Sequence, residues 1–262
     1  MTPPIEAAAL TIRRALEAGV PCAPIRDGVA RNDAATGYAI QEVNTRHWIA
    51  HGRRLVGRKI GLTSNAVQTQ MGVDQPDFGM LYADMHVESG APIAAGRLMQ
   101  PQVEGEVAFV MGRDLPDRVD RAHIAAAIDH ARVAAEIVDS RIAQWNIHIV
   151  DTVADNASSG LYVLGDARVS LHDLDLLEGR MEIERRGEIC SAGTGAACLG
   201  HPLDAVTWLA NVMVEVGRPL TAGDLVLSGA WGPLVAASPG DQMEVRITGL
   251  GAVTACFAPA AG

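Results

Sequence analysis

The spacing of apolar residues predicts two helices at the start of the chain. Between Ile5 and Ala18, apolar side chains recur at helical intervals, and the segment stops at a glycine that a proline follows two residues later. A second helix is predicted from a cap at Asp33 as far as His51. The two helices predict a helical N-terminal lobe over residues 1–54.

From Leu55 onward the pattern changes to short β-branched runs separated by glycine, which is typical of strands. The predicted strands are Leu55–Thr63, Val103–Met111, Ile137–Val138, Leu161–Leu164, Met181–Glu184, Leu225–Ser228 and Gln242–Ile247. Helices are predicted from Arg121 to Ala135 and from Pro202 to Val216. Regular βαβ alternation is missing from this pattern, so the sequence predicts a mixed α+β body over residues 55–262. Pro24–Asn32 is the expected linker between the lobe and this body.

Composition and charge narrow the class of protein. The 262 residues are 48% hydrophobic and 20% charged, which indicates a globular chain and excludes wholesale disorder. A formal net charge of −10 disfavours nucleic acid and anionic membrane surfaces as partners, so a small ligand or a protein is expected. The beginning of the chain lacks a signal-peptide pattern, and we expect a cytoplasmic protein. Four cysteines without a C-x-x-C pair (Cys22, Cys190, Cys198 and Cys256) predict buried, reduced thiols.

Lys59 is the only lysine among 21 basic residues. Arginine is always charged and forked, whereas lysine is a compact ammonium whose pKa shifts readily on burial. The exception therefore indicates a task that a guanidinium cannot perform, although a surface lysine retained by chance is the simpler alternative. Gly57 and Gly61 share the strand face of Lys59, and their missing side chains predict a pocket beside it.

Three acidic residues predict a metal site. Glu104 and Glu106 lie on one face of a predicted strand, and its apolar continuation indicates that both enter a buried region, where a cation would relieve their repulsion. Gly105 between them would permit a close approach to the backbone. Glu136, predicted at a helix-to-strand transition, lies in another apolar stretch. Three carboxylates without a His-x-His or His-Glu-x-x-His pattern favour Mg²⁺ or Mn²⁺ over zinc, while the alternative for the doublet is a solvated edge strand.

Two polar segments complete the candidate chemistry. Gln75–Gly79 reads as a rigid turn that presents Asp77, and Asp155–Gly160 as a polar loop before a strand. Each segment alone is more typical of an ordinary turn. The sequence contains no P-loop, no Gly-x-Ser-x-Gly and no complete dinucleotide fingerprint, which argues against nucleotide cofactors and a serine-hydrolase mechanism.

Taken together, these motifs resemble the 2-keto-4-pentenoate hydratase family of the fumarylacetoacetate hydrolase superfamily, over nearly the whole chain. The motifs that carry the resemblance are Gly57-Arg58-Lys59-Ile60-Gly61-Leu62-Thr63-Ser64, Gln75-Pro76-Asp77-Phe78-Gly79, Glu104-Gly105-Glu106, Glu136-Ile137-Val138-Asp139-Ser140-Arg141, Asp151-Thr152-Val153-Ala154-Asp155-Asn156-Ala157-Ser158 and Leu199-Gly200-His201-Pro202. The resemblance implies an α+β fold, a mixed β-roll of the fumarylacetoacetate hydrolase C-terminal type with a helical N-terminal lobe.

The resemblance also implies roles for single residues. Glu104, Glu106 and Glu136 correspond to the ligands of a divalent metal, Mg²⁺ or Mn²⁺. Lys59 and Asp77 correspond to the polar groups of the reacting centre, and Ser158 to a contact with the substrate carboxylate. Members of the family commonly assemble as homo-oligomers, and a complex with a pathway decarboxylase or aldolase is a further implied partner.

The implied activity is metal-dependent addition of water to 2-hydroxypenta-2,4-dienoate, or a substituted 2-hydroxydienoate, to give a 4-hydroxy-2-oxoacid in aromatic or steroid ring catabolism. Decarboxylases of 4-oxalocrotonate share the lysine, the acids and the Asp-Asn-Ala-Ser loop, so these motifs leave decarboxylation open. The Gln-Pro-Asp-Phe-Gly turn is the hydratase-like version and favours hydration. The further acid and the histidine of the superfamily's hydrolases find no match here, which leaves acylpyruvate hydrolysis as a weaker alternative. An alternative of another class is a non-catalytic partner that stabilises a pathway complex.

Overall fold

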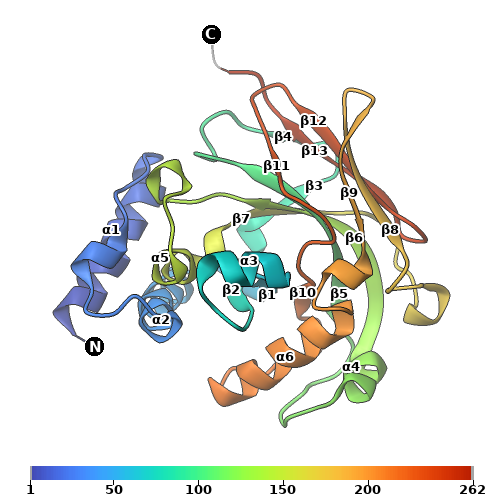
Figure 1. Cartoon of the computed structure of the whole chain (residues 1–262), viewed down its shortest axis with the longest axis horizontal. Coiled ribbons are helices and arrows are strands. Elements are labelled where there is room, and N and C mark those ends of the chain that lie inside the picture. Colours follow the sequence, from blue (N-terminus) through green and yellow to red (C-terminus); the bar gives the residue numbers. More distant parts are fainter. Residues whose placement is uncertain (1, 261–262) are drawn as a thin grey trace.

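The computed structural model describes residues 2–260, except for the side chains of residues 65 and 66. Figure 1 shows helices grouped at two sides of a pair of strongly curved sheets. The helices are α1 Pro3–Ala18, α2 Ala34–Ala50, α3 Asn65–Met71, α4 Arg121–Ala127, α5 Ile149–Ala154 and α6 Pro202–Glu215. The strands are β1 Leu55–Gly61, β2 Asp77–Tyr82, β3 His86–Glu88, β4 Pro92–Ile93, β5 Gln102–Met111, β6 Ile128–Val138, β7 Ser159–Leu164, β8 Arg180–Arg185, β9 Glu188–Thr194, β10 Leu225–Leu227, β11 Val235–Ala236, β12 Gln242–Ile247 and β13 Gly251–Phe257.

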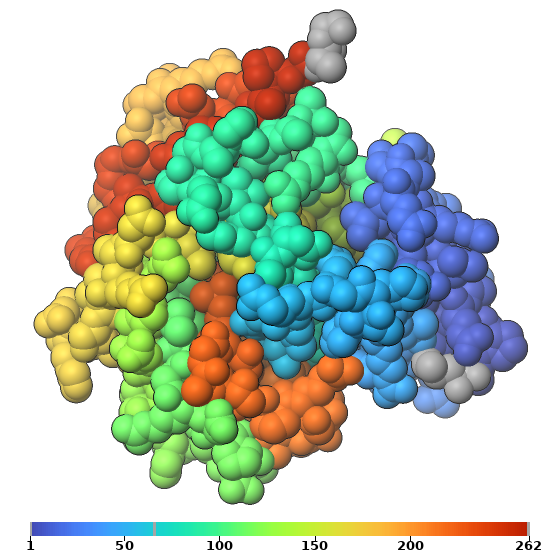
Figure 2. Space-filling model, turned by 180° about the vertical axis from the view of Figure 1, so that it is seen from behind, coloured from blue at the N-terminus to red at the C-terminus, as the bar shows by residue number. Residues whose placement is uncertain are grey.

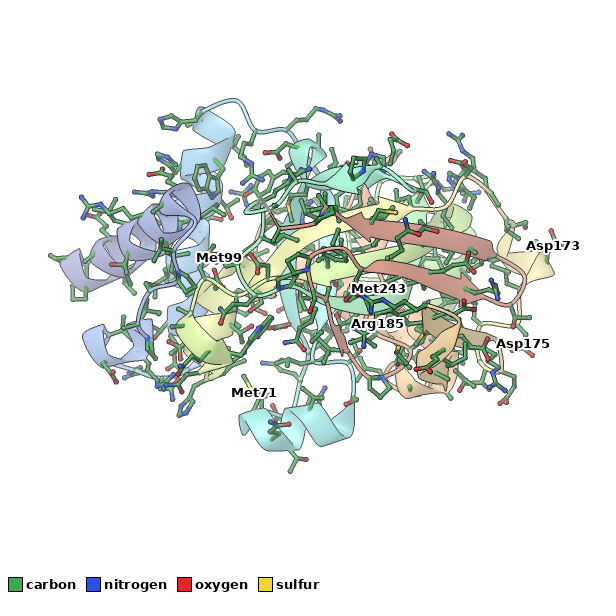
Figure 3. The ribbon with its side chains drawn as sticks, turned by 90° about the horizontal axis from the view of Figure 1, so that it is seen from above. Met71, Met99, Asp173, Asp175, Arg185 and Met243 are labelled. Carbon is green, nitrogen blue, oxygen red and sulfur yellow. The ribbon has the colours of Figure 1, made fainter. Side chains whose placement is uncertain are left out.

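Two mixed sheets form the body. Within the described residues, the larger sheet has the strand order β2-β1-β10-β5-β6-β7-β3, with β11 also paired to β5, and the smaller one has the order β4-β13-β12-β8-β9. Each sheet contains both parallel and antiparallel pairs. Met243 and Arg185, labelled in Figure 3, are cross-strand partners in the smaller sheet. The architecture is therefore α+β, as the sequence predicts.

The main core lies between the two sheets, and Gly105 shows how closely they pack. A Cβ at this glycine would lie 2.6 Å from Met181 Sδ and 3.0 Å from Val245 Cγ1, both in the smaller sheet. The prediction that Gly105 opens the backbone to a ligand is therefore wrong. Its missing side chain admits the neighbouring sheet instead, while Glu104 and Glu106 point to the opposite face of β5.

The N-terminal helices pack beside the larger sheet, where Figures 1 and 2 show them in blue. Ile12 of α1 and Ile40 of α2 are buried in a second apolar cluster together with Val150 of α5. Pro24–Asn32 joins α1 to α2, so its predicted role as the link to the sheet body is wrong. This segment is held firmly, because the backbone N–H groups of Ile25 and Arg26 donate to the Asp151 carboxylate at 2.9 and 3.1 Å.

The helix predicted from Arg121 to Ala135 ends at Ala127, and β6 begins at the next residue. The alanines and isoleucines of this segment match helical spacing, but β6 pairs with β5 on one side and β7 on the other. Pairing along two neighbours outweighs the weak intrinsic preference of alanine for helix. Glu136 therefore lies inside a strand, and its predicted position at a helix-to-strand transition is wrong.

Other parts of the structure are less visible in the sequence pattern. α3, which ends at Met71, projects away from the sheets in Figure 3.

All four cysteines are free thiols, but only Cys198 is buried. Cys190 is exposed and Cys22 and Cys256 are partly exposed, so the prediction of buried thiols is wrong for these three. Among the described residues, we find no helix long and apolar enough to cross a membrane.

Gly57 serves strand packing rather than a pocket. β1 pairs with β10 in parallel, and a Cβ at Gly57 would lie 1.9 Å from the Leu225 carbonyl oxygen. We expect Gly57→Ala to lower the free energy of unfolding by about 2 kcal/mol or more, because backbone and not a flexible side chain occupies the space. Denaturant unfolding measures this change.

Gly28→Ala is the control for that measurement. A Cβ at Gly28 meets no atom within 4 Å, and its backbone has no positive φ. We expect a change within about 0.5 kcal/mol. Equal effects of the two substitutions would contradict the packing role of Gly57.

Candidate metal centre and active site

Neighbouring strands bring the three predicted acids together. Glu104 of β5 is the direct cross-strand partner of Glu136 on β6, and Glu106 lies two residues along β5 on the same face. One carboxylate oxygen from each residue lies within 4.8 Å of the others. Glu106 and Glu136 are buried, whereas Glu104 keeps partial exposure. The sheet therefore concentrates three acids at one point and leaves one side of the group open.

Lys59 reaches this group from the other half of the larger sheet. Its Nζ lies 3.0 Å from Glu136 Oε1, and both side chains are buried. β1 and β6 are separated by β10 and β5, so in a flat sheet their axes would lie about 14 Å apart. The contact forms because side chains from both strands converge on the concave face of the curled sheet. A long, unbranched ammonium spans the distance that remains.

Burial and the local charges shift the pKa values of Lys59, Asp77, Glu104 and Glu106. Burial would lower the pKa of Lys59, but the carboxylates around it, Glu136 foremost, raise its pKa above the ordinary value. Desolvation raises the pKa of Glu104 to about 7 and that of Glu106 well above its usual range. Burial raises the pKa of Asp77 to about 6, against a lowering by Lys59. Lys59 therefore stays an ammonium, while Asp77, Glu104 and Glu106 resist ionisation.

The cluster fits a divalent cation. Glu106 Oε1 and Glu136 Oε2 are buried without a partner among the described residues, and Glu136 Oε1 has the Lys59 ammonium alone. Oxygen donors with free lone pairs are the ligands of Mg²⁺ and Mn²⁺, and histidine and cysteine sulfur, which zinc prefers, are missing from this set. A divalent cation together with the Lys59 ammonium would balance the charge of the three carboxylates. The residues present therefore suit this metal chemistry.

Asp77, at the start of β2, lies next to the lysine. A Cβ at Gly61, its cross-strand partner, would lie 2.3 Å from Asp77 Oδ1 and 3.5 Å from Lys59 Nζ. Gly61 thus leaves space for the Asp77 carboxylate, whereas Gly57 does not contribute to the predicted pocket. Asp77 Oδ1 is buried and has no hydrogen-bond partner among the described residues.

Two residues of α2 hold the backbone next to Asp77. The Tyr38 ring stacks on Phe78 with a centroid distance of 4.4 Å, and its hydroxyl accepts a hydrogen bond from the Phe78 N–H at 3.2 Å. Gln41 Nε2 donates to the Phe78 carbonyl at 2.9 Å. Both backbone groups of Phe78 are therefore fixed by the N-terminal helices, which positions the neighbouring carboxylate.

The Asp155–Ser158 segment acts as a clamp between strands. Asn156 Oδ1 accepts from the Met80 N–H at 2.7 Å, and its Nδ2 donates to the Met80 carbonyl at 2.8 Å, as a neighbouring strand would do. Asp155 is buried against Arg141. Asn156, Ala157 and Ser158 all have positive φ, between 51 and 58°, which is strained for residues other than glycine.

The structure does not join Ser158 directly to the acids. Its hydroxyl hydrogen-bonds with the Thr152 hydroxyl at 3.2 Å, and no hydrogen bond to Lys59 or to the three glutamates is found among the described residues. The next residue in the chain, Ser159, is buried, and its hydroxyl has no hydrogen-bond partner among the described residues. A Cβ at Gly79, the cross-strand partner of Lys59, would lie 2.7 Å from Ser159 Oγ.

Glu106 is held in place through hydrogen bonds of residues that the sequence pattern did not single out. The Gly229 N–H donates to Glu106 Oε2 at 2.8 Å, and Gly229 has a φ of 96°. The Ser228 hydroxyl accepts from the Val107 N–H at 3.3 Å and donates to the Gly229 carbonyl at 3.0 Å, while Cys198 Sγ donates to the Ser228 carbonyl at 3.0 Å. The glycines that follow the predicted strand Leu225–Ser228 were the available signal.

Comparison with known proteins identifies the family of the chain. Residues 48–258 match the fumarylacetoacetate hydrolase C-terminal family. The chain is 59% identical over 254 residues to 2-keto-4-pentenoate hydratase 2 of Dechloromonas aromatica strain RCB, covering 97% of both chains. It is 54% identical over 257 residues to the TodF product hydratase of Pseudomonas putida strain F1, covering 98% of this chain and 96% of the relative. The chain belongs to the 2-keto-4-pentenoate hydratase family.

A solved structure extends the likeness to the three-dimensional fold. The 4-oxalocrotonate decarboxylase from Pseudomonas putida G7, complexed with magnesium and adipate, superimposes with a TM-score of 0.93 at 34% identity, covering 97% of both chains. A divalent metal is thus present in a close structural neighbour of this hydratase-family chain. The likeness also keeps decarboxylation as the nearest alternative chemistry.

Titration of the carboxylate cluster predicts how the metal-free protein responds to pH. Folding raises the pKa of Asp77 from 3.8 to about 6 and that of Glu104 from 4.5 to about 7. The folded state then binds more protons than the unfolded state between about pH 4 and 7, so stability falls as pH rises through this window. We expect the melting temperature in EDTA to fall over that range and added Mg²⁺ to restore it at the upper end.

The Glu104→Gln variant provides the control for the pH experiment. It removes one of the titrating groups, so its melting temperature in EDTA should depend less on pH. A metal-free wild-type melting temperature that rises across the same window would contradict the assignment.

The support behind Glu106 generates a second prediction. Ser228→Ala removes the hydroxyl that holds Gly229, so Glu106 is no longer oriented by the Gly229 N–H. We expect the Mn²⁺ affinity to fall about tenfold, which is typical when a residue that hydrogen-bonds to a metal ligand is replaced. Ser191→Ala is the matched control, because Ser191 is also buried and donates to a carbonyl, that of Pro233, in another part of the fold. Electron paramagnetic resonance of free Mn²⁺ measures both affinities. Equal affinities in the two variants would argue against this role of Ser228.

Proposed function

We propose that this chain is a metal-dependent hydratase that adds water to 2-hydroxypenta-2,4-dienoate, or a substituted 2-hydroxydienoate, to give a 4-hydroxy-2-oxoacid in aromatic or steroid ring catabolism. The observation that carries the proposal is the group of three carboxylates in contact with a single buried lysine. Two relatives named as hydratases are more than 50% identical in sequence to this chain. The reaction is that of a hydro-lyase.

Glu104, Glu106 and Glu136 would hold the Mg²⁺ or Mn²⁺, with Glu106 oriented by the Gly229 N–H. When bound there, the metal would supply Lewis acidity to oxygen atoms of the substrate. Glu104, the partly exposed member, marks the side of the site from which the substrate enters. The buried, curved face of the sheet limits the access of bulk water to the reacting carbon atoms.

Lys59 and Asp77 divide the proton chemistry in this proposal. Lys59 is protonated at rest, so its ammonium stabilises the negative charge on the enolate oxygen. A proton that it passes to C5 is replaced by the proton that leaves the 2-hydroxyl group. Protonation at C5 gives a 2-oxo-3-enoate whose C4 is electrophilic, and water adds there. Asp77, whose pKa is raised to about 6, accepts the proton of that water near neutral pH and returns it to C3, which completes the 4-hydroxy-2-oxoacid. The backbone contacts of Tyr38 and Gln41 hold the Asp77 carboxylate in place for this transfer.

Ser158 is proposed as a contact for the substrate carboxylate. The motif and the strained backbone support this role, because strain clusters at ligand-binding positions. For Ser158 to act, its hydroxyl would exchange the Thr152 partner for a substrate oxygen. Ser159, whose hydroxyl lacks a partner, is available on the same segment.

The broader organisation is proposed on the same basis. Residues 1–54 form a helical N-terminal lobe and residues 55–262 a catalytic body of the β-roll type. The protein is cytoplasmic and assembles as a homo-oligomer, and a pathway decarboxylase or aldolase is its proposed partner in a complex.

Decarboxylation of a 4-oxalocrotonate-type 2-oxo-dienedioate is the second candidate, favoured by the structural likeness to the decarboxylase. The purified chain with Mg²⁺ is assayed separately with 2-hydroxypentadienoate and with 4-oxalocrotonate. Hydration predicts loss of the diene absorbance with the first substrate, abolished by EDTA and restored by Mg²⁺, without CO₂ release from the second. CO₂ release from the second substrate alone would overturn the hydratase proposal. Turnover by the isolated chain would also exclude a purely stabilising, non-catalytic partner.

The role of Lys59 is tested by a substitution that keeps its charge. Lys59→Arg replaces a compact ammonium with a forked guanidinium that cannot occupy the same space between Glu136 and Asp77, so we expect kcat to fall by about a hundredfold or more. Arg58→Lys is the control, because the side chain of Arg58 points to the other face of β1. We expect this variant to stay active. Steady-state kinetics, with circular dichroism for folding, decide the outcome. A fully active Lys59→Arg variant would contradict the assigned role.

A further inference from the structure

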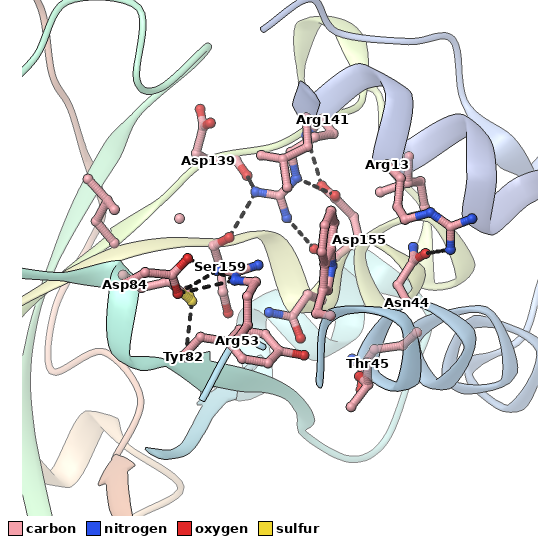
Figure 4. Close-up of a pocket in the computed structure, with 18 of the residues that line it drawn as sticks. Arg13, Asn44, Thr45, Arg53, Tyr82, Asp84, Asp139, Arg141, Asp155 and Ser159 are labelled. Carbon is pink, nitrogen blue, oxygen red and sulfur yellow. Dashed lines mark hydrogen bonds and ion pairs between the residues drawn. The ribbon is translucent and has the colours of Figure 1, made fainter. Parts of the chain in front are cut away.

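A second cavity lies between the N-terminal helices and the larger sheet. It has a volume of about 360 Å³ and is lined by residues of α1, α2, the end of β2 and the start of β7 (Figure 4). This volume lies within the range of small-molecule sites, roughly 300–1,000 Å³. Lys59, Asp77 and the three glutamates of the metal centre do not belong to the lining. The cavity therefore adjoins the proposed catalytic centre, with which it shares Gln41, Asn156 and Ser159, but it does not include the metal-binding acids.

The acidic groups of this cavity already have partners. Asp155 pairs with the buried Arg141, and Asp84 pairs with Arg53 at 2.8 Å. The Asp139 carboxylate accepts hydrogen bonds from the N–H groups of two consecutive residues, 99 and 100. The negative charges in the lining are thus balanced or stabilised from within the chain.

Two arginines in the lining are not paired with a carboxylate. Arg13 of α1 donates to Asn44 Oδ1 at 2.9 Å, and Arg97 donates to the Asp84 carbonyl at 2.8 Å. Among the described residues, neither guanidinium forms an ion pair with a carboxylate. Both therefore keep donors and charge available for an anion, in a chain whose formal net charge is −10.

The rest of the lining contains both apolar and polar side chains. The larger apolar side chains of the wall are Ile12, Leu16, Trp48, Met85, Leu98 and Leu161. Ser159 also lines the cavity, is only 5% exposed, and carries a hydroxyl without a hydrogen-bond partner. A buried hydroxyl without a partner is destabilising.

We propose that this cavity is a second ligand site, which binds a small organic carboxylate with an apolar or aromatic body. Arg13 supplies charge-assisted hydrogen bonds to the carboxylate, Arg97 adds positive charge to the lining, and the apolar side chains cover part of the ligand body. The walls come from α1 and α2 on one side and from the larger sheet on the other. A bound ligand therefore joins these two parts and raises the melting temperature of the protein.

Calorimetric titration of the whole chain with benzoate and with hexanoate tests the site. EDTA is present throughout, so that a carboxylate bound to the metal is not counted. Arg13→Ala removes one guanidinium, and its neighbour Arg14, which is exposed and outside the lining, gives the matched control Arg14→Ala. We expect at least one probe to bind the parent chain and the first variant to lose about tenfold in affinity, while the control retains it.

A second pair of variants tests the cavity without removing a polar contact. Leu16 lines the cavity and is 39% exposed, and Leu10 on the same helix is 37% exposed and lies outside the lining. Leu16→Trp fills the mouth and should weaken binding, whereas Leu10→Trp should not. Both positions are exposed, so folding is expected to survive, and circular dichroism verifies it. Failure of both probes to bind the parent chain at millimolar concentration, or equal affinity in Leu16→Trp and Leu10→Trp, would overturn the proposal.

Discussion

The concentration of negative charge on the concave face of one sheet governs the rest of this structure. Carboxylates held this close in a buried site repel one another strongly, and only a nearby cation makes their joint ionisation favourable. The chain supplies one cation permanently, the Lys59 ammonium, and leaves oxygens free for a second one. Glycines, backbone donors and the curvature of the sheet all serve to hold the groups at these distances.

The N-terminal helices contribute to the site although they carry none of its charged groups. Tyr38 and Gln41 occupy both backbone groups of Phe78, and Asn156 occupies those of Met80 on the same strand. β2 is an edge strand of the larger sheet, where an unpaired backbone would otherwise face solvent. Side chains from distant segments complete its hydrogen bonding, and the position of Asp77 follows from them.

The sequence predicted correctly those elements whose structure is decided by neighbouring residues in the chain. The caps and glycine stops located α1, α2 and α6, and the two-residue spacing of Glu104 and Glu106 placed both on one strand face. It failed where strand pairing decided the outcome. The alanine-rich segment of β6 matches a helix by spacing, but its two neighbouring strands make it a strand. The roles of Gly57, Gly105 and Gly229 depend on segments far away in sequence, which no local pattern contains.

The bond from the Gly229 N–H to Glu106 differs in kind from the ion pair between Lys59 and Glu136. A side-chain donor disappears when its residue is exchanged, whereas a main-chain donor persists through every exchange that preserves the local backbone, proline excepted. The walls around the reacting carbon atoms can therefore be redesigned to admit bulkier molecules without loss of this anchor. The positive φ of Gly229 restricts such redesign at that one position. Catalyst engineering for new dienoates has most freedom in the side chains and least in this short turn.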